Sequence, residues 1–312
     1  MSAPLTIAHI SDVHVTPVKE LTTRQLNLKR TLGLVNWHRG RKHVHRADVA
    51  ALLVEDMRAM RPDHVAVTGD LCNIGLASEY PAARAWLESV GQPRDVTVVP
   101  GNHDIYTRLR KHPGVELWRD FMSSDQSGAG VPGAGTAERG FPIVRHLGCV
   151  ALVGVNSAIE TRPFVAAGRV GARQLAALET VLKALAGRNV ARIVLIHHPP
   201  LPGMAPRLRA LSDAADLAVV LARAGAELVL HGHNHRDTLN WCDAPGGRIP
   251  VVGIASGSAA RQHKGEPLAR YNLIKVRPIE TGWAIEMTGR GMLSPGGGIV
   301  DLDRQVLTQH AG

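Results

Sequence analysis

Cysteine and aromatic residues are both scarce in this sequence of 312 residues. The three cysteines, Cys72, Cys149 and Cys242, form no CxxC pair and cannot supply an even disulfide framework. A reduced, cytoplasmic setting is therefore expected. Phenylalanine, tryptophan and tyrosine together make up 4% of the chain, which leaves few rings for stacking on nucleic-acid bases. No stable nucleic-acid complex is expected.

Long apolar runs are absent as well. The stretch MSAPLTIAHISDVHV lacks a basic region followed by an apolar core, and no run approaches the roughly 18 residues that a membrane-spanning helix needs. Neither a secretion signal nor a spanning segment is expected. Hydrophobic residues still make up 45% of the chain, which is enough for the core of one large domain.

Acidic residues are outnumbered by basic ones, 27 against 36, and the net charge is +9. This balance favours anionic partners such as phosphate esters, nucleic acids or acidic membrane surfaces. The segment from Arg24 to Arg46, here called the basic segment, holds seven Lys or Arg residues and no acid. It is either a solvated basic helix and turn or a flap that recognises phosphate or touches the inner membrane surface. Arg39 and Arg41 are its candidate substrate contacts.

Apolar runs of about five residues alternate with helical patterns along most of the chain. The runs LTIAHI, HVAV, VTVV, VALVG, ARIVL and ELVLH are rich in Val, Ile and Leu, which is typical of strands covered on both faces. Helices are predicted over 47–60, 78–90, 171–185 and 213–224. The alternation predicts an α/β layer architecture.

The C-terminal part of the chain has a different pattern. Three strand-like runs lie between Ile249 and Met287 without a helix between them, and they predict an antiparallel sheet at this end. We expect a single domain over residues 1–290, with the basic insertion at about 20–46, followed by a C-terminal tail over 291–312.

Polar residues follow the predicted strands at the ends where ligands bind in open α/β sheets. This set contains carboxylates, an amide and imidazoles but no thiolate: Asp12, His14, Asp70, Asn102, His197, His233 and His235. Such a mixture suits two borderline-hard divalent metals held close together. A single one of these residues could equally be a helix cap, but capping does not explain four histidines. Asp70 stands alone after its strand, and a carboxylate can bridge two cations.

The motifs DVH, GD, GNHD, HHPP and GHNH occur here in the order that resembles the calcineurin-like metallophosphoesterases. The resemblance spans roughly Leu5 to Ser258. It implies the fold of that family, two packed mixed β-sheets flanked by helices. It also implies a ligand set in which one metal is held by Asp12, His14 and His235, the other by Asn102, His197 and His233, with Asp70 between them.

Three further residues receive roles from the resemblance or from their position. The family places the histidine of its Asn-His-Asp segment near the leaving group, which here is His103, with Asp104 placed to orient or polarise it. His198 adjoins a predicted ligand and either touches the substrate or is a buried, hydrogen-bonded histidine.

The resemblance implies a phosphodiester hydrolase that depends on two divalent metals. Two close cations can share a water, lower its pKa and clamp the phosphoryl oxygens during in-line displacement. Manganese, iron, zinc and cobalt all suit these ligands. The expected substrate is a small phosphodiester of the cyclic-nucleotide or glycerophosphodiester type. Two alternatives stay open: a pyrophosphatase acting on UDP-diacylglucosamine or a related lipid-linked ester, and a non-catalytic nucleic-acid-binding protein.

Overall fold

The strands in the described part of the chain form two sheets of six strands each. They are seen in a computed structural model that describes residues 3–18, 27–109, 112–244 and 247–307. The first sheet has the order β12 (Ile299–Val306), β11 (Trp283–Met292), β10 (Arg270–Pro278), β1 (Leu5–Ile10), β2 (His64–Val67) and β3 (Val96–Val98). The second has the order β4 (Ile143–Leu147), β5 (Val150–Gly154), β6 (Ala191–Leu195), β7 (Leu228–His231), β9 (Gly247–Gly253) and β8 (Thr238–Ala244).

Both sheets mix parallel and antiparallel pairs. In the first, β1, β2 and β3 are parallel while β10 runs antiparallel to β1. In the second, β5, β6, β7 and β9 are parallel, and the edge strands β4 and β8 are antiparallel to their neighbours. The predicted architecture of two mixed sheets is therefore confirmed.

The four predicted helices are present within one residue of their expected starts and ends: α3 (Ala47–Met60), α4 (Glu79–Val90), α6 (Ala172–Ala186) and α7 (Ala214–Ala224). Shorter helices complete the set: α1 (Leu28–Asn36), the π-helix η2 (Trp37–Arg41), α2 (Lys42–Val44), α5 (Gln126–Ala129) and the 3₁₀ helices η3 (Gly114–Met122) and η4 (Glu138–Gly140). None of the helices in the described ranges is long and apolar enough to cross a membrane.

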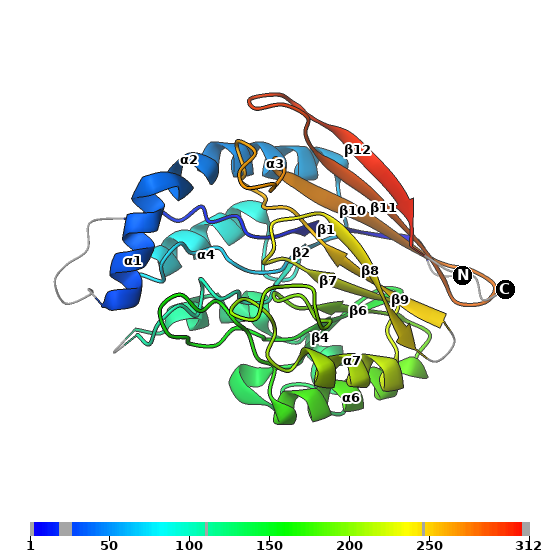
Figure 1. The fold of residues 1–312 in the computed structure, drawn as a ribbon. Coiled ribbons are helices and arrows are strands. Elements are labelled where there is room, and N and C mark those ends of the chain that lie inside the picture. Colours follow the sequence, from blue (N-terminus) through cyan, green and yellow to red (C-terminus); the bar gives the residue numbers. More distant parts are fainter. Residues whose placement is uncertain (1–2, 19–26, 110–111, 245–246, 308–312) are drawn as a thin grey trace.

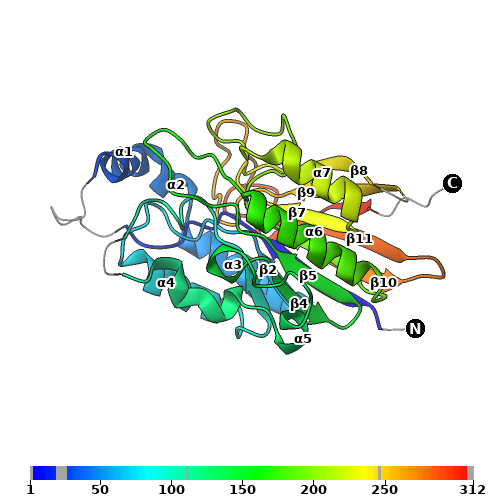
Figure 2. The same cartoon turned by 90° about the horizontal axis from the view of Figure 1, so that it is seen from below.

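The sheets pack face to face, and β5 shows how one strand serves two layers. Val150 and Leu152 belong to the core cluster that contains Ile7 and Val67 of the first sheet. Ala151 and Val153 alternate with them and join the cluster that contains residues of α6 and α7. Successive side chains of a strand point to opposite faces, so an uninterrupted apolar run fills both interfaces. Figures 1 and 2 show α6 and α7 lying along one face of the second sheet.

The C-terminal expectation needs correction. The run over 249–253 does not join an antiparallel sheet of its own, because β9 lies parallel to β7 in the second sheet. Strands β10, β11 and β12 are antiparallel, but they extend the first sheet through β1. The segment 291–312 was expected to be a tail, but it contains β12, which pairs with β11. Residues 308–312 lie outside the described residues.

The basic segment lies at the end of the molecule towards which β1 runs (Figure 1). Its described part, from residue 27 onward, forms α1, η2 and α2; residues 24–26 lie outside the described residues. Because the carboxyl ends of parallel strands carry the ligand sites of such sheets, this placement brings the basic segment to the predicted site.

A buried histidine in the first sheet makes folding sensitive to acid. His64 is 1% exposed, and its Nε2 lies 2.7 Å from Thr97 Oγ1. Burial, followed by the nearby Arg145 charge, lowers the pKa of His64 to about 3. The unfolded chain binds a proton at this position near pH 6.5 while the folded chain does not. The free energy of unfolding is therefore not reduced by His64 above pH 6.5, and it falls progressively as the pH drops from 6.5 towards 3.

We expect His64→Gln to reduce the loss of unfolding free energy on acidification from pH 6.5 to 5 by about 2 kcal/mol, since each pH unit is worth about 1.4 kcal/mol for one such group. Urea unfolding of metal-free wild-type and variant protein at both pH values measures this difference. Equal losses in the two proteins would show that His64 does not titrate differently on unfolding.

Candidate metal centre

Five of the seven predicted metal ligands have a left-handed backbone. The φ angles are 54° for Asp12, 42° for His14, 57° for Asp70, 70° for His233 and 52° for His235. This conformation is disfavoured for residues other than glycine, by about 1–2 kcal/mol each, and it clusters at functional sites. Each of these residues follows a strand of the parallel part of its sheet. The sharp change of direction turns the side chains into the space between the two sheets' strand ends.

The loop carrying Asp70 is held by one buried carboxylate. Asp104 Oδ2 accepts the backbone N–H groups of Asp70 (2.8 Å) and Gly101 (2.9 Å). Its Oδ1 accepts those of Leu71 and Cys72, each at 2.9 Å. The prediction that Asp104 orients or polarises His103 is therefore wrong, because its oxygens face the backbone of these loops. The side chain is 1% exposed and needs these donors to offset burial.

The first group of donors consists of Asp12, His14 and His235, whose ligand atoms all lie within 4.8 Å of one another. His235 Nε2 is 3.2 Å from Asp12 Oδ1. His14 Nε2 is 3.9 Å from Asp70 Oδ2. These are the residues that the sequence analysis assigned to one metal, and the fold brings them together.

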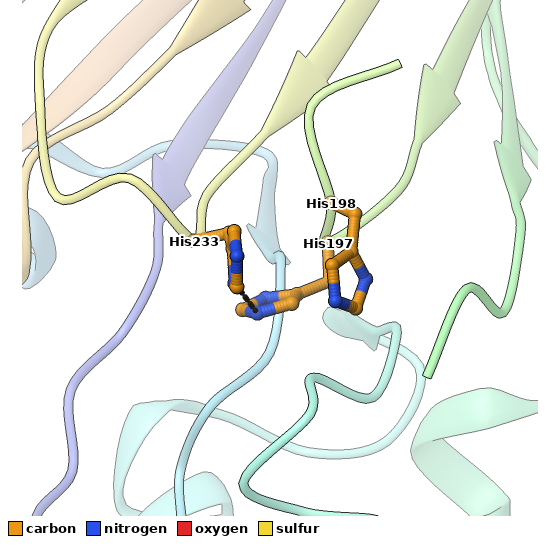
Figure 3. A group of neighbouring side chains, drawn as sticks. All are labelled: His197, His198 and His233. Carbon is orange, nitrogen blue, oxygen red and sulfur yellow. Dashed lines mark hydrogen bonds between the residues drawn. The ribbon is translucent and has the colours of Figure 1, made fainter. Parts of the chain in front are cut away.

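The second group gathers around His197. Its Nε2 lies 3.2 Å from Asn102 Oδ1, 3.2 Å from His233 Nδ1 and 3.5 Å from Asp70 Oδ2. Figure 3 shows His197 and His233 joined in this way, although they follow different strands. The residues predicted to hold the other metal are thus also adjacent, and one oxygen of Asp70 lies within 4 Å of both groups.

Hydrogen bonds of the histidines fix which ring nitrogen faces the donor groups. Three of them use Nδ1 outside the donor groups: His14 with the Cys72 carbonyl (2.8 Å), His197 with the Thr68 carbonyl (2.7 Å) and His235 with the Glu266 carboxylate (3.2 Å). A carbonyl can only accept, so Nδ1 of His14 and His197 carries a hydrogen, and Nε2 is the nitrogen that a metal would bind. Such outer contacts are how proteins fix the tautomer of metal-binding histidines.

These residues fit two divalent cations. A metal bound at about 2.0–2.2 Å by nitrogen and oxygen places neighbouring ligands roughly 3–3.6 Å apart, close to the separations seen around His197. The charges agree as well. Burial alone would lower the pKa of His197 and His235, but the carboxylates of Asp70 and Asp12 raise both pKa values to about 9. Divalent cations would displace these protons.

His103 and Arg41 face each other beside the first donor group. The Nδ1 of His103 bonds the Asn73 carbonyl, so in the neutral ring Nε2 is an acceptor, and Arg41 donates to it at 3.1 Å. Burial, followed by the Arg41 charge, lowers the pKa of His103 to about 3. The other end of the guanidinium donates to His14 Nε2 at 2.9 Å. One lone pair cannot serve both Arg41 and a metal, so the two compete for His14.

The other two candidate substrate contacts differ in position. Arg39 is exposed and lines the cleft at the donor groups. His198 is fully buried, with Nδ1 2.8 Å from Ser157 Oγ and Nε2 3.2 Å from the Ala166 carbonyl. Both ring nitrogens have partners, and the buried ring also belongs, with His197 and His233, to a group that could hold a metal. Contact of His198 with the substrate stays a prediction.

Sequence reasoning missed several residues of the site, among them His45 and Glu266. The His45 ring lies 4.6 Å from that of His14 and 5.3 Å from that of His235, and its Nδ1 contacts Ser258 Oγ at 3.0 Å. Glu266 supports His235. His45 lies within the basic run of the sequence and Glu266 in a loop beyond the last motif, and neither follows an apolar run that would have drawn attention to it.

The donor groups open into a cleft of about 390 Å³. Four of its lining residues are fixed cations, and two are carboxylates: Arg39, Arg41, Arg209, Lys264, Asp70 and Glu266. This surface suits an anionic ligand placed beside the two donor groups.

Comparison with known proteins agrees with this geometry. The family model described as calcineurin-like phosphoesterase matches residues 5–237. A probable cyclic nucleotide phosphodiesterase of Synechococcus sp. (strain WH7803) is 26% identical over 250 residues, which are 78% of this chain and 77% of the relative. A dimetal phosphatase from Danio rerio has a similar fold, with a TM-score of 0.57, 16% identity and coverage of 95% of this chain and 98% of the other. A 5′-nucleotidase precursor from Thermus thermophilus gives a TM-score of 0.51 at 16% identity over 93% of this chain and 55% of that one.

We expect close to two divalent metals per chain in wild-type protein and at most one in Asp70→Asn. The asparagine can keep the contact of Oδ1 with the His103 N–H (2.7 Å), but it loses the charge that can bridge two cations. Elemental analysis after reconstitution with excess Mn²⁺ and desalting measures the ratio. Asp216→Asn, the same change at an exposed position of α7, is the control. Two metals in Asp70→Asn would contradict the bridging role.

We expect Arg41→Met to tighten Mn²⁺ binding by roughly tenfold or more, because the change removes both the competing donor and a nearby positive charge. Competition against a chromogenic chelator measures the affinity. The adjacent, exposed Lys42→Met is the matched control for loss of charge. An unchanged affinity in Arg41→Met, or an equal gain in Lys42→Met, would show that Arg41 does not compete with the metal.

Proposed function

Because this chain belongs to the calcineurin-like phosphoesterase family, we propose that it hydrolyses a small phosphodiester of the cyclic-nucleotide or glycerophosphodiester type. The chain is a phosphoric ester hydrolase, and its His and Asp side chains form groups able to hold metals. The proposal adds the class of ester and the roles of individual residues.

One observation carries the proposal: a single carboxylate oxygen, Asp70 Oδ2, lies 3.9 Å from His14 Nε2 and 3.5 Å from His197 Nε2. Two divalent ions held on either side of it would supply nucleophile activation and charge neutralisation for phosphoryl transfer. The protein's own contribution is to hold the ligands rigidly through backbone turns and through the Nδ1 contacts of the histidines.

His103 and Arg41 are the proposed groups for the leaving oxygen. His103 is fixed by the Asn73 carbonyl and directs Nε2 towards Arg41. Negative charge on a departing alkoxide would draw Arg41 away from His14 and would favour a protonated His103 beside it. The pair then stabilises the developing charge through N–H donors, the step that controls cleavage of esters with poor leaving groups.

The choice of a diester rests on the sequence relative, whereas the charge of the cleft suits any phosphate ester. The relative carries the name of a probable cyclic nucleotide phosphodiesterase and matches 78% of this chain. Arg39 and Arg209 line the cleft outside the donor groups and would attract a phosphate ester over about a Debye length, roughly 8 Å at physiological salt.

We expect the chelated and Mn²⁺-reconstituted protein to hydrolyse bis-nitrophenyl phosphate with a higher kcat/KM than nitrophenyl phosphate, and to lose both activities on chelation. His103→Ala should keep its metals but slow hydrolysis by roughly 10²–10⁴-fold, the usual size of acid–base assistance. Esters with alkyl leaving groups should lose more than nitrophenyl esters, because a nitrophenolate needs little stabilisation.

His146→Ala serves as the control for loss of an imidazole, since His146 lies on β4 at an edge of the second sheet. A faster reaction with the monoester would contradict the choice of a diester. Metal loss in His103→Ala, or equal losses for both kinds of leaving group, would contradict the role of His103.

A further inference from the structure

Helix α1 buries two charged side chains and exposes two large apolar ones. Its cations Lys29 and Arg30 are only 8% and 6% exposed, whereas Leu28 and Val35 are 66% and 41% exposed. Leu28, Leu32 and Val35 are spaced four and three residues apart, so they share one face of the helix. A helix that only covered the body of the protein would bury this face and leave the cations in water.

The buried cations fasten α1 to three loops. Lys29 Nζ donates to the Tyr106 carbonyl (2.9 Å), to the Thr161 carbonyl (3.2 Å) and to Thr161 Oγ1 (2.7 Å). Arg30 donates to the Gly75 carbonyl at 2.8 Å. At Gly33, an added Cβ would lie 2.7 Å from Tyr106 Oη, so the helix and Tyr106 are in direct contact. The apolar face of α1 is therefore held in a fixed place.

That face forms one wall of a groove of about 400 Å³. Leu32 and Val35 line it from α1. Tyr106 lines it from the loop after β3, and Pro163 and Phe164 line it from the loop after β5. Phe164 is 80% exposed and has a φ of 64°. A left-handed backbone is unusual for a bulky residue, and here it presents an aromatic ring at the groove. Strain of this kind collects at functional sites.

The groove is continuous with the cleft at the metal centre. Asn36 and Arg39 line both. Tyr106, in the groove wall, stacks on the ring of His103 with centroids 5.4 Å apart and planes 20° from parallel. A phosphate held at the donor groups would thus have one ester substituent next to the mouth of the groove.

We propose that the groove between α1 and the Pro163–Phe164 loop binds an apolar substituent of the phosphoester substrate, an alkyl or aryl group carried on an ester oxygen. The inference rests on the proposed function, because it takes the phosphate to lie at the donor groups. The occupant follows from two features of the surroundings: an apolar wall, and a junction lined by Asn36 and the cation Arg39 that leads to the donor groups.

Binding of n-alkylphosphonates to the Mn²⁺-reconstituted protein tests the groove without any leaving group. Methyl-, butyl- and octylphosphonate present the same headgroup, and calorimetry at concentrations below micelle formation gives their Kd values. We expect affinity to rise about two- to fourfold for each added methylene until the groove is filled, as for burial of hydrocarbon.

Val35→Asn and Phe164→Ser should each abolish most of this gain with chain length. Val219→Asn and Leu293→Ser are the matched controls, since Val219 is 46% exposed and Leu293 is 75% exposed on other elements; both should keep the wild-type dependence. Metal content is measured in every variant, so that loss of the metal centre is recognised separately.

Three results would overturn the inference: affinity independent of chain length in the wild type, a dependence retained in both groove variants, or no binding of any phosphonate. Recruitment of the protein to phosphatidylcholine vesicles through Val35 and Phe164, together with a flat phosphonate series, would assign this face to a membrane surface instead. Hydrolysis of bis-nitrophenyl phosphate is assayed in parallel. An affinity that rises with chain length, without hydrolysis, would support binding of the apolar substituent in the groove and refute the proposed function. Hydrolysis together with an affinity independent of chain length would support the proposed function and refute the role of the groove.

Discussion

The carboxylate of Asp104 is the contact on which the arrangement of the metal centre depends. It accepts four backbone N–H groups from two loops, those that follow β2 and β3, and so fixes the loop of Asp70 against the loop of Asn102. The arrangement has a cost: burial, followed by the nearby Asp70 charge, raises the pKa of Asp104 to about 7. Four donors offset this cost. With its Oδ1 held by the His103 N–H, Asp70 directs Oδ2 to both donor groups.

The same logic explains why glycine precedes the ligands. At Gly101, an added Cβ would lie 2.2 Å from Asp70 Oδ1, and at Gly232 it would lie 2.4 Å from Asp12 Oδ2. Ligands from separate strands can approach each other only if the backbone between them carries no side chain. The left-handed backbone of five ligands likewise helps to bring the ligands together. Such strained turns persist where the surrounding contacts fix the backbone.

Periodicity and strand-end chemistry were sufficient to predict the central strands and the four long helices. They also selected, as candidate metal ligands, seven side chains that the fold brings together. They failed where partners are set by distant contacts. β4, β8 and β12 are edge strands with interrupted apolar patterns. β9 has the same apolar pattern as the strands that follow it, but it pairs with β7 in the second sheet, and the local pattern does not specify which strand is the partner. His45 and Glu266 reach the centre from loops without a motif. The resemblance implied that Asp104 orients or polarises His103, whereas hydrogen bonding turns its carboxylate towards the backbone.

The basic segment shows most clearly what composition cannot resolve. Its charges form a single run in the sequence, yet the fold gives them separate tasks. Lys29 and Arg30 donate to backbone carbonyls and hold α1 in place. Arg39 is exposed at the mouth of the cleft, and Arg41 donates to His14 and His103. Burying the first two cations turns the apolar face of α1 outward, and the π-helix that follows α1 carries Arg41 to the donor groups. A run that composition describes as one charged surface therefore supplies both an apolar wall next to the cleft and a cation that reaches the donor groups.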